Sequence, residues 1–289
     1  MTEIIPPDRV FQPAREEAET ARHQTVVPQT QDPAYRLAFQ DMDFLLREDL
    51  RPVRFQLELL KPELLLNEAK IASTFVMYGS ARIPEPAAAD ALVDAAATDR
   101  QRLIAGRLKE KAKYYDEARA LARTASQAEP DHRGWRQFVV CSGGGPSIME
   151  AANRGAADVG AESIGLNIVL PHEGVPNDWV TPHLSFQFHY FALRKMHFLL
   201  RARAVAVFPG GFGTMDECFE LLTLIQTGKV KPLPILFFGR EFWERVVNFE
   251  ALVDEGVISE RDLDLFRFVE TADEAWEHVR AWWSEPSLA

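Results

Sequence analysis

The chain has 289 residues, of which 47% are hydrophobic and 26% charged, enough to build one large domain or two small ones. Its net charge of −11 argues against general binding of nucleic acid, because that function needs a basic surface. We expect no membrane span and no export signal, since no apolar run reaches the required length of about 18 residues and the N-terminus lacks a basic region followed by an apolar one.

The N-terminal part of the chain is predicted to lie outside the main domain. Residues 1–32 are polar, contain prolines and show no periodicity, so we expect a mobile tail. Residues 33–70 are predicted to form a helical extension. Within it, apolar side chains recur at helical spacing over 33–50, which indicates an amphipathic helix packed on the main body. The segment 51–66 is predicted to be a second packing element that is broken at Pro62.

From Ser73 onward, short apolar runs alternate with helical patterns. Nearly continuous apolar strands separated by helices are typical of a parallel sheet covered on both faces. We therefore predict an α/β fold, a Rossmann-like parallel sheet, for a nucleotide-binding catalytic domain over residues 71–289. Ligands of such sheets bind outside the carboxyl ends of the strands. The predicted strands are 74–79, 137–141, 163–171, 184–190, 204–210 and 234–239; one or two helices are expected in 87–128, one after strand 137–141, and others at 191–202, 215–228, 241–253, 260–266 and 271–284.

Cysteine and histidine usage says little about chemistry. The two cysteines, Cys141 and Cys218, each lie in an apolar element, where a cysteine acts as a small hydrophobic residue. So few cysteines favour a reducing, cytoplasmic location. The seven histidines show no H-E-x-x-H or comparable spacing, so no metal ligand is assigned.

A first glycine-rich joint, "CSGGGPSIME", connects a predicted strand to a predicted helix. Gly143, Gly144 and Gly145 follow the strand, and Pro146 suits an early helical position. Glycine lets a ligand touch the backbone, and the start of a helix offers unpaired N–H groups and a positive dipole end. A tight turn without a ligand explains the same pattern equally well.

The second joint, "VFPGGFGTMDE", gives a sharper signal. Converging N–H groups from Gly210 to Thr214, together with the Thr214 hydroxyl, would suit a phosphate. Two glycine joints at one edge of one sheet favour a phosphate-bearing ligand. The chain lacks both the G-x-G-x-x-G pattern after its first strand and a G-x-x-x-x-G-K-[ST] motif, so dinucleotide and triphosphate binding of those types are not supported.

Two charged features accompany the second joint, and each has two interpretations. Thr214 and Glu217 have the spacing of a helix capping box, in which the acid only satisfies a backbone N–H. A carboxylate one turn past a phosphate cradle would instead lie near the sugar of a nucleotide. Arg194 and Lys195 are either a solvated basic pair or, because their helix is otherwise apolar, a buried pair that needs an anionic partner.

These motifs together resemble a known family. "PGGFGTMDE" matches the PGGxGTxxE signature of the LOG ("lonely guy") family, and "LRKM" matches its arginine–lysine motif. "GGGPSIMEAA" resembles the GGGPGIMEA segment of the longer members, with Ser147 where glycine is usual, and "YGSAR" resembles the turn after the family's first strand. The resemblance spans about residues 70–250 and is closest to a longer bacterial branch.

The resemblance implies a phosphoribohydrolase that splits a nucleoside 5′-monophosphate into free base and ribose 5-phosphate. AMP and cytokinin riboside monophosphates are the family's substrates, and members have often been labelled lysine decarboxylases. The family needs no cofactor and forms homodimers with the active site near the subunit interface. The partner implied for this chain is thus a small nucleotide and a second copy, without nucleic acid or membrane.

The resemblance also implies roles for single residues. Arg194 and Glu217 become the catalytic pair. Glu217 would stabilise the positive charge that develops on the ribose, while Arg194 would hold the substrate and keep Glu217 ionised. The substrate contacts become Gly79, Ser80, Gly144, Gly145, Glu173, Lys195, Gly210, Gly211, Phe212, Gly213, Thr214 and Thr223.

Two other functions fit parts of the pattern. A carrier or sensor could bind a phosphorylated ligand without hydrolysing it, as in the molybdenum-cofactor carrier proteins that this architecture also resembles. A decarboxylase would need a lysine that forms a Schiff base with pyridoxal phosphate, and the one lysine linked to a motif is Lys195. The acid beside the predicted cradle favours the hydrolase.

Overall fold

The computed structural model describes residues 11–171 and 175–284. The chain divides into two compact units, residues 1–58 and 59–289, and the boundary falls inside helix α4 (Arg51–Glu68). The larger unit contains the sheet and both glycine joints.

The smaller unit is built from short helices. The segment expected to be a tail contains helix α1 (Ala14–Arg22) and the single turn α2 (Pro28–Gln31), and residues 1–10 lie outside the described part of the chain. The single helix predicted for residues 33–50 is wrong. That segment forms four short elements, η1 (Pro33–Tyr35), η2 (Ala38–Gln40), α3 (Met42–Leu45) and η3 (Glu48–Leu50).

An aspartate within residues 33–50 helps to explain why they do not form one helix. Asp32 only caps the start of the segment, where it accepts a hydrogen bond from the backbone N–H of Ala34 at 2.9 Å, whereas Asp41 lies inside the segment and accepts one from Phe44 at 3.2 Å. Such caps start a new turn at each aspartate, because the side chain takes the place of a backbone acceptor. The apolar periodicity alone therefore gave the wrong length.

Helix α4 continues through Pro62, so the predicted break is also wrong. Proline removes one N–H donor from a helix interior, which normally favours a kink or an end. Here the turns around Pro62 are held by tertiary contacts: the Arg201 guanidinium donates to both carboxylate oxygens of Glu63, at 3.1 and 3.0 Å, and Leu66 is buried. Packing outweighs one missing hydrogen bond.

The described residues of the larger unit form one seven-stranded parallel sheet, in the order β4-β3-β2-β1-β5-β6-β7, which confirms the predicted Rossmann-like α/β fold. Each predicted strand is present. A seventh strand was missed because its three residues leave no apolar run to detect. The strands are β1 (Thr74–Tyr78), β2 (Val139–Ser142), β3 (Ile164–Ile168), β4 (Ser185–Phe188), β5 (Ala202–Val207), β6 (Ile235–Phe238) and β7 (Arg267–Val269).

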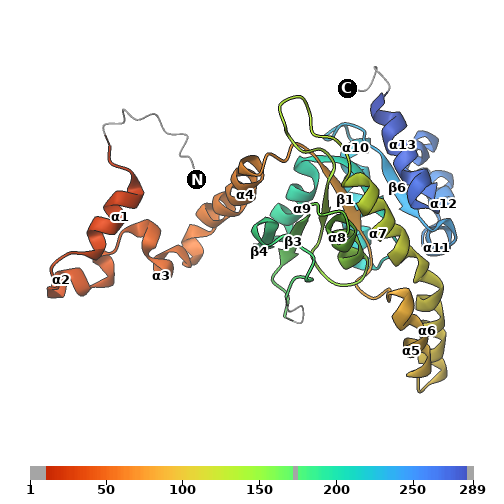
Figure 1. Cartoon of the computed structure of the whole chain (residues 1–289), viewed down its shortest axis with the longest axis horizontal. Helices are drawn as coiled ribbons and strands as arrows, with labels where there is room; N and C mark the ends of the chain where they lie inside the picture. The colour runs from red at the N-terminus through yellow and green to blue at the C-terminus, as the bar shows by residue number, and fades with distance from the viewer. Residues whose placement is uncertain (1–10, 172–174, 285–289) are drawn as a thin grey trace. The chain divides into compact units, whose positions relative to one another are not determined.

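Helices connect these strands and cover the sheet (Figure 1). The region 87–128, for which one or two helices were predicted, contains three, and the predicted helix 260–266 is a 3-10 helix, η5 (Glu260–Leu265). A further 3-10 turn, η4 (Pro182–Leu184), precedes β4. The helices are α5 (Pro86–Asp94), α6 (Asp99–Lys111), α7 (Lys113–Ala125), α8 (Ile148–Ala157), α9 (Phe191–Leu200), α10 (Phe212–Gln226), α11 (Arg240–Val246), α12 (Phe249–Asp254) and α13 (Ala272–Ser284).

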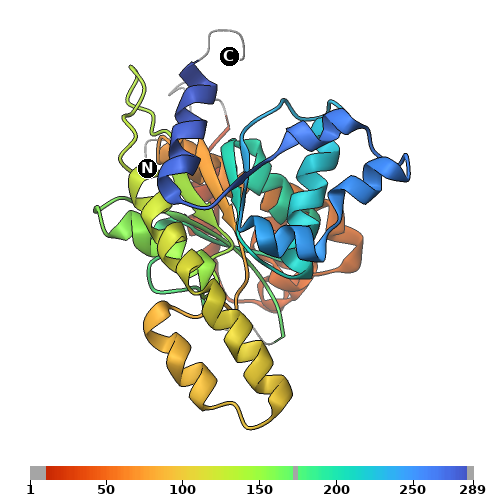
Figure 2. The ribbon, with the colours of Figure 1, turned by 90° about the vertical axis from the view of Figure 1, so that its right-hand side faces the viewer.

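The two faces of the sheet carry different helices. On one face, side chains of β1 such as Phe75 and Met77 pack with residues of α7, α8 and α13 in one buried apolar cluster. Figure 1 shows α7 and α8 side by side on this face. On the other face, Tyr78 packs edge-on against Phe198 of α9, with ring centroids 5.0 Å apart, and α10 packs on β1. Helices α5 and α6 pair as a hairpin that extends away from the sheet (Figure 2).

The chain order creates a switch point between β1 and β5. From β1 the chain builds outward through β2, β3 and β4, and then returns to the other side of β1 to build β5, β6 and β7. Hydrogen bonds join the ends of the two central strands, from Phe208 N–H to the Tyr78 carbonyl at 2.9 Å and from Ser80 N–H to the Pro209 carbonyl at 3.1 Å. Open α/β sheets bind ligands at such a point, and the second glycine joint lies there.

No helix in the described part of the chain is long and apolar enough to cross a membrane.

Candidate active site

The second glycine joint starts helix α10 at Phe212, earlier than the predicted position near Thr214. A Cβ on Gly210 would collide with the buried side chain of Thr214, so packing alone requires glycine there. A Cβ on Gly211 or Gly213 would meet no atom within 4 Å. Packing therefore does not require glycine at either position. Gly213 lies inside the helix, where glycine costs about 1 kcal/mol relative to alanine, whereas Gly211 is the N-cap residue, where glycine is common.

The same joint exposes the positive end of a 15-residue helix. The first N–H groups of a helix have no partner within it, and the helix dipole favours an anion beside them. Phe212, at the first helical position, is 93% exposed and does not cover the joint with a buried contact. The joint has the features of an accessible anion site.

Arg194 and Glu217 form a buried ion pair beside this joint. The Arg194 Nη1 and Glu217 Oε1 atoms lie 3.2 Å apart, and the two side chains are only 11% and 13% exposed. Arg194 lies on α9, whereas Glu217 lies on α10 one helical turn after Gly213, so the glycine and the carboxylate share one side of the helix. The pair thus brings charge to the sheet edge where the helix offers free N–H groups.

Arg194 is fixed from three further directions. Its Nε donates to the Leu166 carbonyl of β3 at 2.7 Å, and its guanidinium lies 5.0 Å from the ring centroid of Phe198. A Cβ on Gly143 would lie 2.6 Å from its Nη2, so the absence of a side chain at the first joint makes room for this arginine. Buried arginines need such partners, because an unpaired buried charge is costly.

The capping-box interpretation of Glu217 is wrong. Because α10 begins at Phe212, Glu217 is in its second turn, too far along the helix to reach the N-cap backbone, and the helix has no side-chain N-cap bond. Its carboxylate contacts Arg194 instead. The buried-pair interpretation of Arg194 is the correct one.

Burial dominates the protonation of Glu217. It raises the pKa of this carboxyl from 4.5 to about 7; Arg194 lowers the pKa but does not offset the loss of solvent, and the neighbouring Asp216 raises it further. Arg194 favours the ionised form of Glu217, as expected, but burial has the larger effect on the pKa. Near neutral pH, the protonated and ionised forms have comparable populations, which suits a group that exchanges protons.

Lys195 binds acids of the same helix that carries Glu217. Its Nζ lies 3.1 Å from Asp216 Oδ1 and 3.3 Å from Glu220 Oε2. Burial lowers the pKa of Lys195, but hydrogen bonds to these two carboxylates raise it more, so the pKa lies above its ordinary value. Lys195 thereby joins α9 to α10 next to the Arg194–Glu217 pair.

The first glycine joint is engaged within the protein. The Gly144 N–H donates to Ser142 Oγ at 3.1 Å, and the carbonyls of Gly144 and Gly145 accept from the backbone N–H and Nδ2 of Asn177, at 2.8 and 2.9 Å. The sequence predicted that this joint could offer free N–H groups to an anion, as the second joint does. The N–H of Gly144 is not free, because it donates to Ser142 Oγ. The missing side chain at Gly143 makes room for Arg194, and the one at Gly144 makes room for Asn167.

Ser147 keeps a glycine-like backbone at the position where the family usually has glycine. Its φ of 66° and ψ of −122° are unfavourable for a residue with a side chain. Its buried hydroxyl donates to the Ile83 carbonyl, a contact that glycine could not make. A side-chain hydrogen bond thus accompanies a backbone conformation that favours glycine.

The other predicted contacts do not all lie at the switch point: Gly79 and Ser80 follow β1 there, whereas Thr223 lies about three turns along α10. A Cβ on Gly79 would lie 2.5 Å from Ile148, so this glycine lets α8 approach β1. Ser80 Oγ accepts from the Arg82 N–H at 3.0 Å. Thr223 is exposed on α10, and its hydroxyl donates to the Phe219 carbonyl at 2.7 Å. Glu173 lies outside the described residues.

Sequence reasoning missed several groups around the pair. Tyr78, at the end of β1, is buried, and burial followed by the charge of Glu217 raises its pKa well above the ordinary value. Cys141 and Cys218 are buried free thiols whose pKa values are raised by burial. The sheet brings Tyr78 of β1 and Cys141 of β2 to the pair, and no local pattern indicates that approach. Asp216 and Cys218 are the direct sequence neighbours of Glu217 on α10.

Among residues 11–171 and 175–284, no three or more histidine, cysteine, aspartate and glutamate side chains gather as a metal site requires.

Comparison with known proteins gives one family and a set of distant structures. A family model described as "Possible lysine decarboxylase" matches residues 149–279, a segment that contains Arg194 and Glu217. The X-ray structure of TM1055 is 19% identical, covers 72% of this chain and 99% of its own, and has a TM-score of 0.46. The Moco carrier protein from Chlamydomonas reinhardtii is 16% identical, with 72% and 96% coverage and a TM-score of 0.42. A search of curated proteins finds no match to this sequence.

The raised pKa of Glu217 predicts a defined pH dependence of stability. Between pH 4.5 and about 7 the folded protein binds more protons at this site than the unfolded chain, so this carboxyl lowers the free energy of unfolding as the pH rises. Glu217→Gln cannot titrate. The quantity to follow is the difference in unfolding free energy, variant minus wild type. This difference should increase with pH between pH 4.5 and about 7, by at most about 1.4 kcal/mol per pH unit, and stay constant at higher pH. Urea unfolding at pH 5 to 8 measures this; a difference independent of pH would contradict the raised pKa.

Proposed function

We propose that this chain, whose residues 149–279 match the family model described as "Possible lysine decarboxylase", has a different activity: hydrolysis of the N-glycosidic bond of a nucleoside 5′-monophosphate. The substrate is of the AMP or cytokinin riboside monophosphate type, and the products are the free base and ribose 5-phosphate. The observation that carries the proposal is the buried Arg194–Glu217 pair beside a glycine joint whose open positions packing does not require.

The second glycine joint is proposed to bind the 5′-phosphate. Helix α10 directs its first N–H groups and its positive dipole end to this position, and Gly211 and Gly213 leave space for phosphate oxygens to approach the backbone. Binding a remote phosphate supplies energy that positions the bond to be broken. The site thus needs no basic side chain at the phosphate itself.

Glu217 is proposed to act on the sugar. Cleavage of the bond from C1′ to the base nitrogen builds positive charge on the ribose, and a carboxylate near C1′ stabilises that transition state. The base leaves with the electron pair of the broken bond and gains a proton from solvent. Water bonds to C1′ and transfers one of its protons to the ionised Glu217. A pKa of about 7 lets Glu217 accept that proton and release it again between turnovers.

Arg194 and Lys195 are proposed to hold Glu217 in place. Arg194 contacts the carboxylate at 3.2 Å and is itself fixed by the Leu166 carbonyl, so it presents the acid in one orientation. Lys195 fixes the helix that carries Glu217 through Asp216 and Glu220. The same contacts disfavour a Schiff-base role for Lys195, because a lysine held by two carboxylates stays protonated and is a poor nucleophile.

Incubation with AMP tests the reaction. We expect adenine and ribose 5-phosphate in equal amounts by chromatography. Glu217→Gln should lower kcat by a factor on the order of 100 or more with nucleotide affinity largely kept, since the carboxylate acts mainly in the transition state. The matched control Glu250→Gln, on the exposed surface of α12, should leave kcat unchanged. Tight AMP binding without base release from any common monophosphate would instead support a carrier or sensor.

The phosphate site has its own test. Gly213→Ala adds a methyl group where the protein leaves open space, so the fold should keep its stability while the KM for AMP rises about tenfold. The matched control is Gly106→Ala in α6, which is equally open and helical but far from the joint in the sequence. It should leave KM unchanged. A Gly213→Ala enzyme with wild-type KM would exclude close approach of the phosphate to this residue.

A further inference from the structure

A cavity of about 680 Å³ lies at the ends of β3 and β4, outside the proposed catalytic site. The first glycine joint forms one wall through Gly145, and the segment 175–179 forms another. This volume falls within the range of small-molecule sites, about 300 to 1,000 Å³. The polar and aromatic side chains that give it its character are those of Glu150, Asn167, Asn177, Asp178, Trp179 and Gln187.

Two polar side chains of the cavity, those of Asn167 and Gln187, lie on the face of the sheet opposite α9, the helix that carries Arg194. Asn167 of β3 and Gln187 of β4 are register partners, so their side chains point to the same side. The next residue along β4, Phe188, packs on His197 of α9 at a centroid distance of 5.3 Å. Because successive side chains of a strand alternate, Asn167 and Gln187 point away from α9, to the side of α8.

The first glycine joint separates the two sites. Arg194 lies against Gly143, whereas Gly145, two residues later, lines the cavity. Leu166 accepts the hydrogen bond of Arg194, and the next residue, Asn167, lines the cavity. A single joint and a single strand thus form the back of both sites.

The wall formed by residues 177–179 is held before any ligand binds. Asn177 binds the first joint through its backbone N–H and its Nδ2, as described above, and Nδ2 also donates to Oδ1 of the fully buried Asn153 at 3.0 Å. The Trp179 N–H donates to Asn177 Oδ1 at 3.1 Å. The backbone at Trp179 is therefore held in place by the side-chain amide of Asn177.

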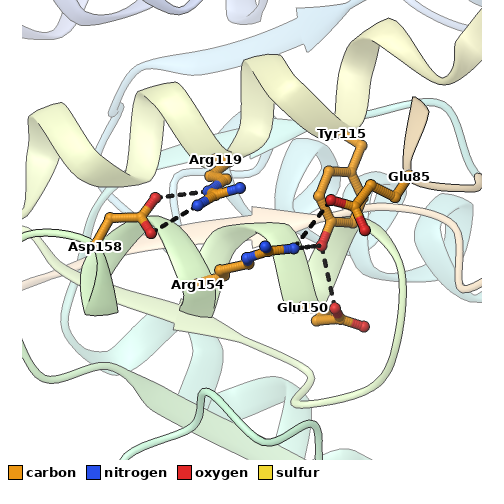
Figure 3. Close-up of polar contacts among 6 residues, drawn as sticks. All are labelled: Glu85, Tyr115, Arg119, Glu150, Arg154 and Asp158. Atoms are coloured by element: carbon orange, nitrogen blue, oxygen red, sulfur yellow. Dashed lines mark hydrogen bonds and ion pairs between the residues drawn. The ribbon is translucent and has the colours of Figure 1, made fainter. Parts of the chain in front are cut away.

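A chain of polar contacts supports both Trp179 and Glu150; Figure 3 draws the side chains of this chain except that of Trp179. The Arg154 guanidinium lies 5.3 Å from a Trp179 ring centroid, and its Nη1 donates to Glu85 Oε1 at 3.1 Å and to the Tyr115 hydroxyl at 3.4 Å. Tyr115 in turn donates to Glu150 Oε1 at 3.1 Å. Figure 3 shows these side chains converging between α7 and α8, which the Arg119–Asp158 ion pair also joins. Such a supported shell is what positions a binding group.

The lining selects a neutral or positively charged ligand with N–H donors. Among the described residues that line the cavity there is no lysine, arginine or histidine, and two carboxylates face it, so a phosphate would be repelled. Carboxylates and amide oxygens accept hydrogen bonds from ring or exocyclic N–H groups, and an indole offers a flat surface for stacking. An amino-substituted heteroaromatic ring meets all of these demands.

We propose that this cavity binds an amino-substituted heteroaromatic base such as adenine, at a site separate from Arg194 and Glu217. Adenine is chosen because it is a product of the proposed hydrolysis, so this choice rests on the proposed function. The separation of the two sites does not rest on that function. Base–aromatic stacking on Trp179 and hydrogen bonds to Glu150, Asp178 and Gln187 supply the recognition.

Calorimetric titration with adenine, using the full chain, tests the proposal. The wild type should bind adenine, and Trp179→Ser should weaken binding about tenfold or more, while Trp179→Phe, which keeps a ring, should lose far less. Glu217→Gln, and wild type saturated with ribose 5-phosphate, should bind adenine as the free wild type does. Circular dichroism of each variant shows that it is folded.

Three results would overturn the proposal: no adenine binding to the wild type, unchanged binding in folded Trp179→Ser, or loss of binding in Glu217→Gln or with ribose 5-phosphate. Binding of 1,4-diaminobutane in place of adenine would also overturn it, because a flexible cation needs no stacking surface. Adenine binding with the expected pattern in a protein that releases no base from AMP would refute the proposed hydrolysis and leave the cavity assignment standing.

Discussion

The ion pair between Arg194 and Glu217 constrains much of the surrounding structure. Two charges withdrawn from water are tolerated only when each is well partnered. Arg194 therefore draws on the Leu166 carbonyl, the Phe198 ring and the bare backbone at Gly143, so that β3, α9 and the first glycine joint all serve its placement. The same burial moves the pKa of Glu217 to about 7. The packing that buries the ion pair therefore also sets the pKa of Glu217.

Much of the fold was predictable because its signals are local. Strands buried on both faces appear as continuous apolar runs, and all six that carry such a run were found. The elements that were predicted wrongly have two kinds of cause: a local side-chain contact that competes with a longer helix, or a contact with a residue distant in the sequence. The side chain of Asp41 starts a new turn inside an apolar periodicity, and helix α4 continues through Pro62 because Arg201, far along the chain, binds Glu63. Strand β7, with three residues, was too short to detect.

The site was predictable in its elements but not in its pairing. An arginine in an apolar helix needs an anion, and that requirement was readable from residues 191–202. Which anionic group pairs with this arginine depends on how α9 and α10 pack on the sheet. The three glycines after β2 were interpreted as a possible anion cradle; one makes room for Arg194, and the carbonyls of the other two bind Asn177, more than thirty residues later, which no local pattern indicates. The balance between burial and Arg194 that sets the Glu217 pKa also requires coordinates.

A crystal structure of the Glu217→Gln variant with AMP is the most direct measurement of the central claim, that an acid buried against Arg194 faces a sugar whose phosphate lies on the start of α10. The phosphate should accept hydrogen bonds from backbone N–H groups of residues 211–214, with C1′ of the ribose next to residue 217. A nucleotide whose phosphate binds elsewhere, or whose ribose lies away from residue 217, would contradict the claim.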